Sequence, residues 1–110
     1  MAGEPIVVVI TYKAQPGQGA RTLHELTALI GEVVAREPDC GGIRIHHDPD
    51  DETRVLLYEQ WSSRDAYTGP HMQTPYLGAF MARAREFLAG PPTIEFWRLD
   101  GDVTPSLASS

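Results

Sequence analysis

The stretch Tyr58-Glu-Gln-Trp-Ser-Ser-Arg-Asp-Ala-Tyr-Thr-Gly-Pro-His71 predicts a strand that runs directly into a helix, and the rest of the chain is arranged around it. Side chains alternate between the two faces of a strand, so one face carries Val55, Leu57, Glu59 and Trp61. Glu59 is therefore a carboxylate among apolar neighbours, which is an unusual position for an ionisable group.

The second half of this stretch predicts a short helix that ends abruptly. The Ser62-x-x-Asp65 pattern is a capping signature for a helix over about 63–69, and Gly69-Pro70 ends that helix. His71 stands just past the break, so a carboxylate, an indole, a phenol (Tyr67) and an imidazole fall within one short segment. Each of them also has an ordinary structural role available, because perturbed groups occur in structural networks as well as in active sites.

Length and composition predict a single domain with its own hydrophobic core. The chain has 110 residues, of which 42% are hydrophobic and 22% are charged, and its net charge of −6 argues against binding to nucleic acid or to an anionic membrane surface. It contains no apolar run long enough to span a membrane and no secretory signal pattern. Cys40 is the one cysteine, which excludes an internal disulfide and suits a reducing cytoplasm.

Hydrophobic periodicity switches between the strand and the helix pattern along the chain. The predicted elements are a strand over 6–12, a helix over about 20–36, strands over about 42–48 and 54–61, the short helix, a longer helix opening at Thr74-Pro75 and a strand over 93–99. This order is the split βαβ arrangement of a ferredoxin-like α+β sandwich. We expect one domain over residues 1–99 and a flexible tail over residues 100–110, which have little to bury.

A sheet with helices on one side leaves its other side open to water. The first strand is apolar on both faces, and Ile94 and Trp97 point to opposite faces of the last strand. We therefore predict that a second copy of the chain covers the open face, giving a homodimer in which the two sheets close into a barrel.

Several blocks of this sequence, taken in order, resemble one known family. The blocks are Pro16-Gly17, Arg36-Glu37-Pro38-x-Cys40-Gly41, Tyr58-Glu59-x-Trp61, Ala66 and His71-x-x-Thr74-Pro75-Tyr76. Together they resemble the antibiotic biosynthesis monooxygenase family of dimeric α/β-barrel proteins, over roughly residues 6–99. Since one fold hosts many functions, the resemblance implies the fold more strongly than the activity.

The resemblance implies oxidation of phenols, hydroquinones or anthrones to quinones by dioxygen, without a flavin, haem or metal cofactor. It places His71 or Glu59 as the catalytic base, and the residues that line the substrate pocket as Trp61, Tyr67, Tyr76 and Phe80. Polyketide-oxidising members carry an asparagine four residues before the tryptophan, where this chain has Leu57.

Two alternatives to the monooxygenase remain. One is a non-catalytic small-ligand-binding or stress-associated dimer, in which Glu59 and His71 bond to each other beside a filled cavity. The other is an isomerase acting on a phosphorylated signalling sugar, which needs a cationic pocket supplied by Arg44 and Arg83. An open apolar cleft of a few hundred Å³ would favour the monooxygenase instead.

Overall fold

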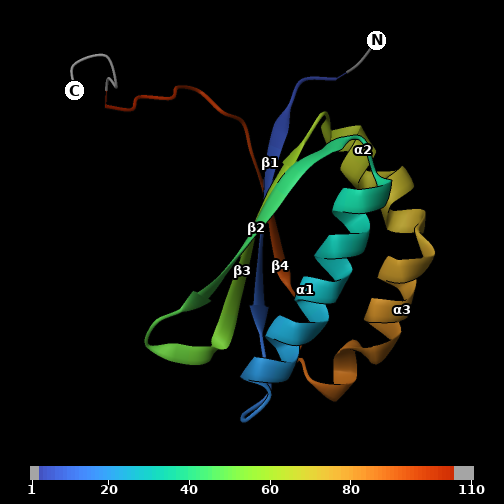
Figure 1. Ribbon diagram of the computed structural model, residues 1–110, viewed down its shortest axis with the longest axis vertical. Coiled ribbons are helices and arrows are strands. Elements are labelled where there is room, and N and C mark those ends of the chain that lie inside the picture. The colour runs from blue at the N-terminus through green and yellow to red at the C-terminus, as the bar shows by residue number, and fades with distance from the viewer. Residues whose placement is uncertain (1–2, 106–110) are drawn as a thin grey trace.

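The computed structural model of this protein describes residues 3–105, which form a four-stranded antiparallel sheet covered on one face by helices (Figure 1). The elements in chain order are β1 (Ile6–Lys13), α1 (Gly19–Arg36), β2 (Cys40–Asp48), β3 (Asp51–Trp61), α2 (Arg64–Thr68), η1 (Pro70–Gln73), α3 (Pro75–Arg83), η2 (Ala84–Glu86) and β4 (Thr93–Trp97). None of the helices within residues 3–105 combines the length and the apolar character needed to cross a lipid bilayer.

The strands lie in the order β2-β3-β1-β4, and every neighbouring pair is antiparallel. This order confirms the ferredoxin-like α+β fold predicted from the sequence. The register places Val8 of β1 opposite Glu59 on β3 and opposite Phe96 on β4. Glu59 therefore sits at the middle of the sheet, next to a central strand that is buried on its helical face.

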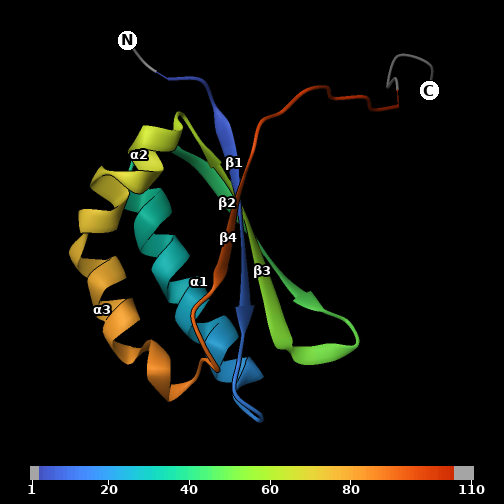
Figure 2. The ribbon, with the colours of Figure 1, turned by 180° about the vertical axis from the view of Figure 1, so that it is seen from behind.

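The core lies between the sheet and the helices, which share one side of the sheet in both views (Figures 1 and 2). Leu26 and Val33 on α1 are almost completely buried, as the helical spacing predicted. The helical spacing of apolar residues also includes Val34, but Val34 is 50% exposed on the outer side of α1, while the adjacent Val33 takes the inward position. Successive side chains of a helix are turned by about 100°, so Val34 points away from the sheet when Val33 is centred on it.

Within residues 3–105, no helix covers the other face of the sheet (Figure 1). Val7 and Val9 of β1 point to this face and are half-buried, while Trp97 of β4 is 56% exposed there. The observed alternation along β4 agrees with the sequence, because Phe96 faces the core and Trp97 faces away from it.

Several boundaries differ from the sequence-based expectation. β2 begins at Cys40 rather than 42, β3 begins at Asp51 rather than 54, and β4 ends at Trp97 rather than 99. The N-cap of α2 is Ser63, whose hydroxyl accepts a hydrogen bond from the Ala66 amide, whereas the Ser62 hydroxyl donates to Asp39 at 2.6 Å. The capping box predicted at Ser62 is therefore wrong by one residue. Beyond Trp97, residues 98–105 are exposed and have no regular secondary structure. Their flexibility stays a prediction, and residues 106–110 of the predicted tail lie outside the described residues.

Candidate active site

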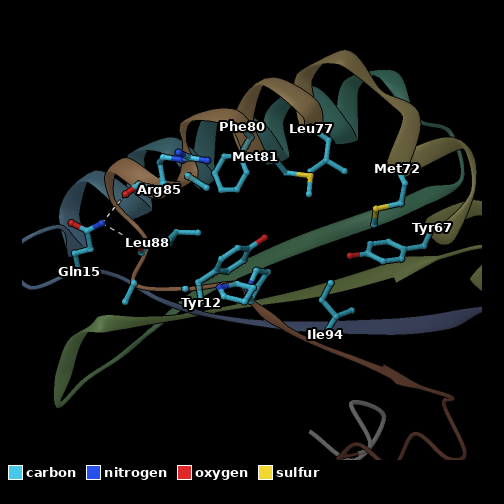
Figure 3. Close-up of a pocket in the computed structure, with 15 residues that line it drawn as sticks. Tyr12, Gln15, Tyr67, Met72, Leu77, Phe80, Met81, Arg85, Leu88 and Ile94 are labelled. Atoms are coloured by element: carbon cyan, nitrogen blue, oxygen red, sulfur yellow. Dashed lines mark hydrogen bonds between the residues drawn. The ribbon is translucent and has the colours of Figure 1, made fainter.

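An open pocket of about 630 Å³ lies between the sheet and α3 (Figure 3). β1 contributes Tyr12, α2 contributes Tyr67, α3 contributes Phe80 and β4 contributes Ile94. The remaining lining residues are mainly apolar and include Met72, Leu77, Met81, Ala84, Leu88, Ala89, Pro91 and Pro92. This volume is in the range that holds a small organic ligand, and the lining suits an apolar one.

Two phenols project into this pocket from opposite sides. Tyr12 is 5% exposed and Tyr67 is 3% exposed, and their hydroxyls point toward one another across the pocket (Figure 3). Within residues 3–105, neither hydroxyl has a hydrogen-bond partner. Burial and the nearby Glu59 carboxylate raise the pKa of both phenols above the usual value, so both keep their protons at neutral pH.

Glu59 lies behind these phenols on the helical face of β3. Its side chain is 3% exposed, and its Oε1 accepts a hydrogen bond from the Trp61 indole nitrogen at 2.8 Å. The two residues share one face of the strand because they are two positions apart. Burial raises the pKa of the Glu59 carboxyl to about 7, although the Trp61 hydrogen bond acts in the opposite direction. Glu59 can therefore exchange a proton near neutral pH.

A second carboxylate, that of Glu37, connects the end of α1 to η1 and to the start of α3. Glu37 follows the last residue of α1, where Pro38 prevents the helix from continuing. His71 lies in η1 after the Gly69-Pro70 break, and its Nδ1 is 3.1 and 3.0 Å from the two Glu37 carboxylate oxygens. The Tyr76 hydroxyl at the start of α3 also donates to Glu37. Burial and this contact raise the pKa of Tyr76 to about 12.

An aromatic stack connects this cluster to the pocket. The His71 ring lies 5.0 Å from the Tyr67 ring with 28° between their planes, and 4.7 Å from the Trp61 ring. Trp61 and Tyr67 meet edge to face at 5.5 Å. The His71 ring therefore stacks on Tyr67, which lines the pocket, while its Nδ1 is hydrogen bonded to Glu37.

The structure divides the predicted site residues into two groups. Tyr67 and Phe80 line the pocket, whereas the other four, which are Glu59, Trp61, His71 and Tyr76, lie outside its lining. Trp61 is turned toward Glu59, and Tyr76 is turned toward Glu37. Glu59 and His71 are not hydrogen bonded to each other, because each has a separate partner.

Sequence reasoning missed Tyr12, Glu37 and Arg85 as site residues. Tyr12 shares the core face of β1 with Val8 and Ile10, so its spacing of two could have placed it in the pocket. Glu37 looked like an ordinary helix end before a proline. Arg85 is the one ionised side chain in the lining, and no local pattern distinguishes it from other helix arginines.

The two arginines expected to bind phosphate do not serve this pocket. Arg44 pairs with Tyr58 in the sheet register and so lies on the face away from the helices. Arg83 donates to Glu25 at 2.9 Å on the exposed side of α3. Neither belongs to the lining, so the expected cationic pocket built from Arg44 and Arg83 is not present.

Comparison with known sequences identifies relatives over most of the chain. A family model described as antibiotic biosynthesis monooxygenase matches residues 5–83. The uncharacterized protein sll1783 of Synechocystis sp. (strain ATCC 27184 / PCC 6803 / Kazusa) is 29% identical over 98 residues, which are 89% of this chain. The matched region spans 65% of the length of that curated relative.

Several solved structures share the fold of this chain. A Caulobacter crescentus CB15 protein, provisionally named an antibiotic biosynthesis monooxygenase, is 29% identical with a TM-score of 0.80, covering 90% of this chain and 92% of that one. PA3566 from Pseudomonas aeruginosa is 26% identical with a TM-score of 0.78, covering 91% and 99%. Rv0793 from Mycobacterium tuberculosis, at 20% identity and a TM-score of 0.78 over 92% and 100%, shares the fold.

Proposed function

Because this chain belongs to the antibiotic biosynthesis monooxygenase family, we propose that it oxidises phenolic, hydroquinone or anthrone-type aromatic substrates with dioxygen, without a cofactor. The observation that carries the proposal is the apolar pocket of about 630 Å³ that two buried phenols enter beside a carboxyl group whose pKa is about 7. An apolar pocket suits a flat aromatic ring, and a carboxyl that titrates near neutrality suits a base.

The reaction is balanced by the substrate and dioxygen alone. In an anthrone, the central CH₂ loses a proton to a base, and the resulting electron-rich anion passes one electron to dioxygen. The two radicals then recombine at that carbon. One oxygen atom of dioxygen becomes the new carbonyl, and the other leaves as water with the two hydrogens of the former CH₂. The protein supplies deprotonation, orientation and a dry pocket.

Glu59 is the base we propose for this step, and the proton would reach it by way of the pocket phenols, because its own side chain lies outside the pocket lining. Its carboxyl is buried next to the two pocket phenols and has a pKa suited to accepting a proton near pH 7. His71 keeps Tyr67 in position, because it stacks on that ring and is itself held by Glu37. In this proposal Phe80 and Tyr67 form the walls that contact the ring, Trp61 orients Glu59, and Tyr76 orients Glu37.

The test is oxygen consumption by the purified protein with an anthrone and, separately, with a menadiol-like hydroquinone. We expect uptake above the rate without protein, and labelled dioxygen should place one labelled atom in the new carbonyl of the anthrone product. Glu59→Gln and His71→Ala should each remove most of the protein-dependent rate, whereas His24→Ala on the exposed side of α1 should not change it. Uptake equal to background with both substrates would refute the activity.

A second candidate is a ligand-binding protein without catalysis. The observation that favours it is that the Glu59 and His71 side chains already hold internal partners and lie outside the pocket lining. Saturable binding of an anthrone under nitrogen, with no protein-dependent oxygen uptake in air, would support this candidate over the monooxygenase.

The bare face of the sheet suggests a homodimer as the functional form. Val7, Val9 and Trp97 lie on this face, and apolar surface of this kind is stabilised by burial against a partner. We expect Trp97→Asp to shift the protein from dimer to monomer in light scattering. The matched control is Val34→Asp, which introduces the same charge at an exposed apolar residue on the helical side. Wild-type protein that stays monomeric at micromolar concentration would contradict the dimer.

A further inference from the structure

We infer that Tyr12 and Tyr67 form a two-donor hydrogen-bond site for a single carbonyl oxygen of the aromatic ligand, which makes Tyr12 a substrate-binding residue. The inference deepens the proposed function and rests on it for the aromatic class of the ligand. The two residues come from β1 and α2, which are far apart in the sequence and meet at this pocket.

Two hydroxyls without a protein partner face the pocket. Tyr12 and Tyr67 are each more than nine-tenths buried as whole residues, and neither hydroxyl bonds to any residue within 3–105. No buried side-chain nitrogen or oxygen in this part of the chain lacks a partner, so both hydroxyl oxygens are accessible from the open pocket. A ligand that displaces water from the pocket must supply an acceptor, because a polar group buried without a partner is costly. Both hydroxyls are aimed into the pocket and toward each other (Figure 3). A ligand atom between them would satisfy both.

The two phenol hydroxyls favour a carbonyl oxygen as the ligand atom between them. Both phenols stay protonated, so each offers an O–H donor to the pocket. A carbonyl oxygen has two lone pairs and can accept both bonds at once. The nearby Glu59 carboxyl disfavours an anionic group at this end of the pocket, because like charges repel once Glu59 is ionised. A neutral carbonyl is therefore preferred over a carboxylate or a phosphate.

The surrounding walls match the rest of such a ligand. Phe80 meets the Tyr12 ring edge to face at 6.2 Å, and Leu77, Met72 and Ile94 complete an apolar lining near the two hydroxyls. A flat ring system attached to the carbonyl would contact these side chains. The pair of donors would then fix which edge of the ring system lies against the two phenols.

The experiment compares 9-fluorenone with fluorene, which have the same ring system and differ by the carbonyl oxygen. Binding is measured by isothermal titration calorimetry under nitrogen, with wild-type protein and with Tyr12→Phe, Tyr67→Phe and the double variant. Tyr58→Phe, on the opposite face of the sheet, is the matched control. Each phenylalanine keeps the ring and removes only the hydroxyl.

We expect wild-type protein to prefer fluorenone about 10-fold, and each single variant to lose about 3-fold to 10-fold in fluorenone affinity, as for one hydrogen bond each. Fluorene affinity should not change, and the Tm of each variant should not fall, because the removed hydroxyl bonds to no protein group. A Tyr12→Phe variant that keeps the full preference, or a wild-type protein that shows none, would overturn the inference.

This binding experiment is independent of turnover. An intact fluorenone preference without oxygen uptake would refute the proposed monooxygenase and leave the two-donor site standing. Oxygen uptake with no role for the Tyr12 hydroxyl in binding would refute the two-donor site and leave the monooxygenase standing.

Discussion

Glu37 and Glu59 are both withdrawn from solvent, but the groups around the two carboxylates differ. The Glu37 carboxylate is hydrogen bonded to the His71 Nδ1 and accepts a hydrogen bond from the Tyr76 hydroxyl, so both of its oxygens have partners. Glu59 is more deeply buried and receives a single hydrogen bond, from Trp61. Burial with a single donor raises the pKa of the Glu59 carboxyl to about 7, which suits proton transfer. The bonds that Glu37 makes to His71 and Tyr76 suit a structural anchor.

The largest expected effect comes from removing the partner of Glu59. Trp61→Ala should destabilise the protein by about 3–5 kcal/mol, because a 2% exposed indole is lost from the core and a cavity remains. Denaturant unfolding followed by circular dichroism measures this change. Val34→Ala is the control, and at 50% exposure on the outer side of α1 it should cost much less. Similar losses for both variants would contradict the buried position of Trp61.

Glu59→Gln, in contrast, should stabilise the protein at high pH. The pKa of Glu59 is raised from 4.5 to about 7 on folding, so its ionisation opposes folding. The penalty is absent below pH 4.5, grows between pH 4.5 and 7, and is complete above about pH 7, where it reaches about 3 kcal/mol. The variant should therefore match wild type at pH 4 and exceed its stability by up to about 3 kcal/mol at pH 8.

Urea unfolding at pH 4, 6 and 8 checks this pH dependence. If Glu59→Gln shows the same difference from wild type at all three pH values, the carboxyl of Glu59 does not titrate in this range and cannot be the proposed base.

Glu37→Gln should destabilise the protein by about 1–3 kcal/mol, because His71 contacts both carboxylate oxygens and Tyr76 donates to one of them, whereas an amide can accept at only one atom. Unfolding at pH 7 measures the loss. Glu32→Gln is the matched control on the same helix, where an exposed pair with Arg36 should be worth less than about 1 kcal/mol. Equal effects at the two positions would argue against the anchoring role of Glu37.

The smallest effect is expected for Tyr76→Phe, which removes one donor from Glu37 and leaves the His71 contact in place. The loss should be about 0.5–1.5 kcal/mol in the same unfolding experiment. Combining Tyr76→Phe with Glu37→Gln should cost less than the sum of the two, since both changes remove the same bond. Strict additivity would show that the hydroxyl does not depend on Glu37.

The sequence was most informative where a pattern repeats. The apolar run of β1, the alternation along β3 and the helical spacing on α1 predicted the sheet and the ferredoxin-like order, because burial acts on repeating positions of a strand or helix. Glu59 was found the same way, as a carboxylate on a buried strand face.

The contacts of the site could not be read in the same way, because they join segments that are far apart in the sequence. Glu37 and His71 are separated by 34 positions and meet only when α1 and η1 pack together. The sequence also could not tell which of Ser62 and Ser63 caps α2. The structure shows that the Ser62 hydroxyl donates to Asp39, whereas the Ser63 hydroxyl accepts from the Ala66 amide of the helix.

The two tryptophans of this chain differ in environment enough to act as separate optical probes. Trp61 is 2% exposed and contacts the aromatic stack behind the pocket, while Trp97 is 56% exposed on the bare face of the sheet. The fluorescence of Trp97 should be quenched by iodide and protected when a second molecule covers that face. Trp61 should resist iodide and respond instead to a ligand in the pocket. A single emission spectrum therefore carries information on both assembly and occupancy, and a Trp97→Phe variant separates the two contributions.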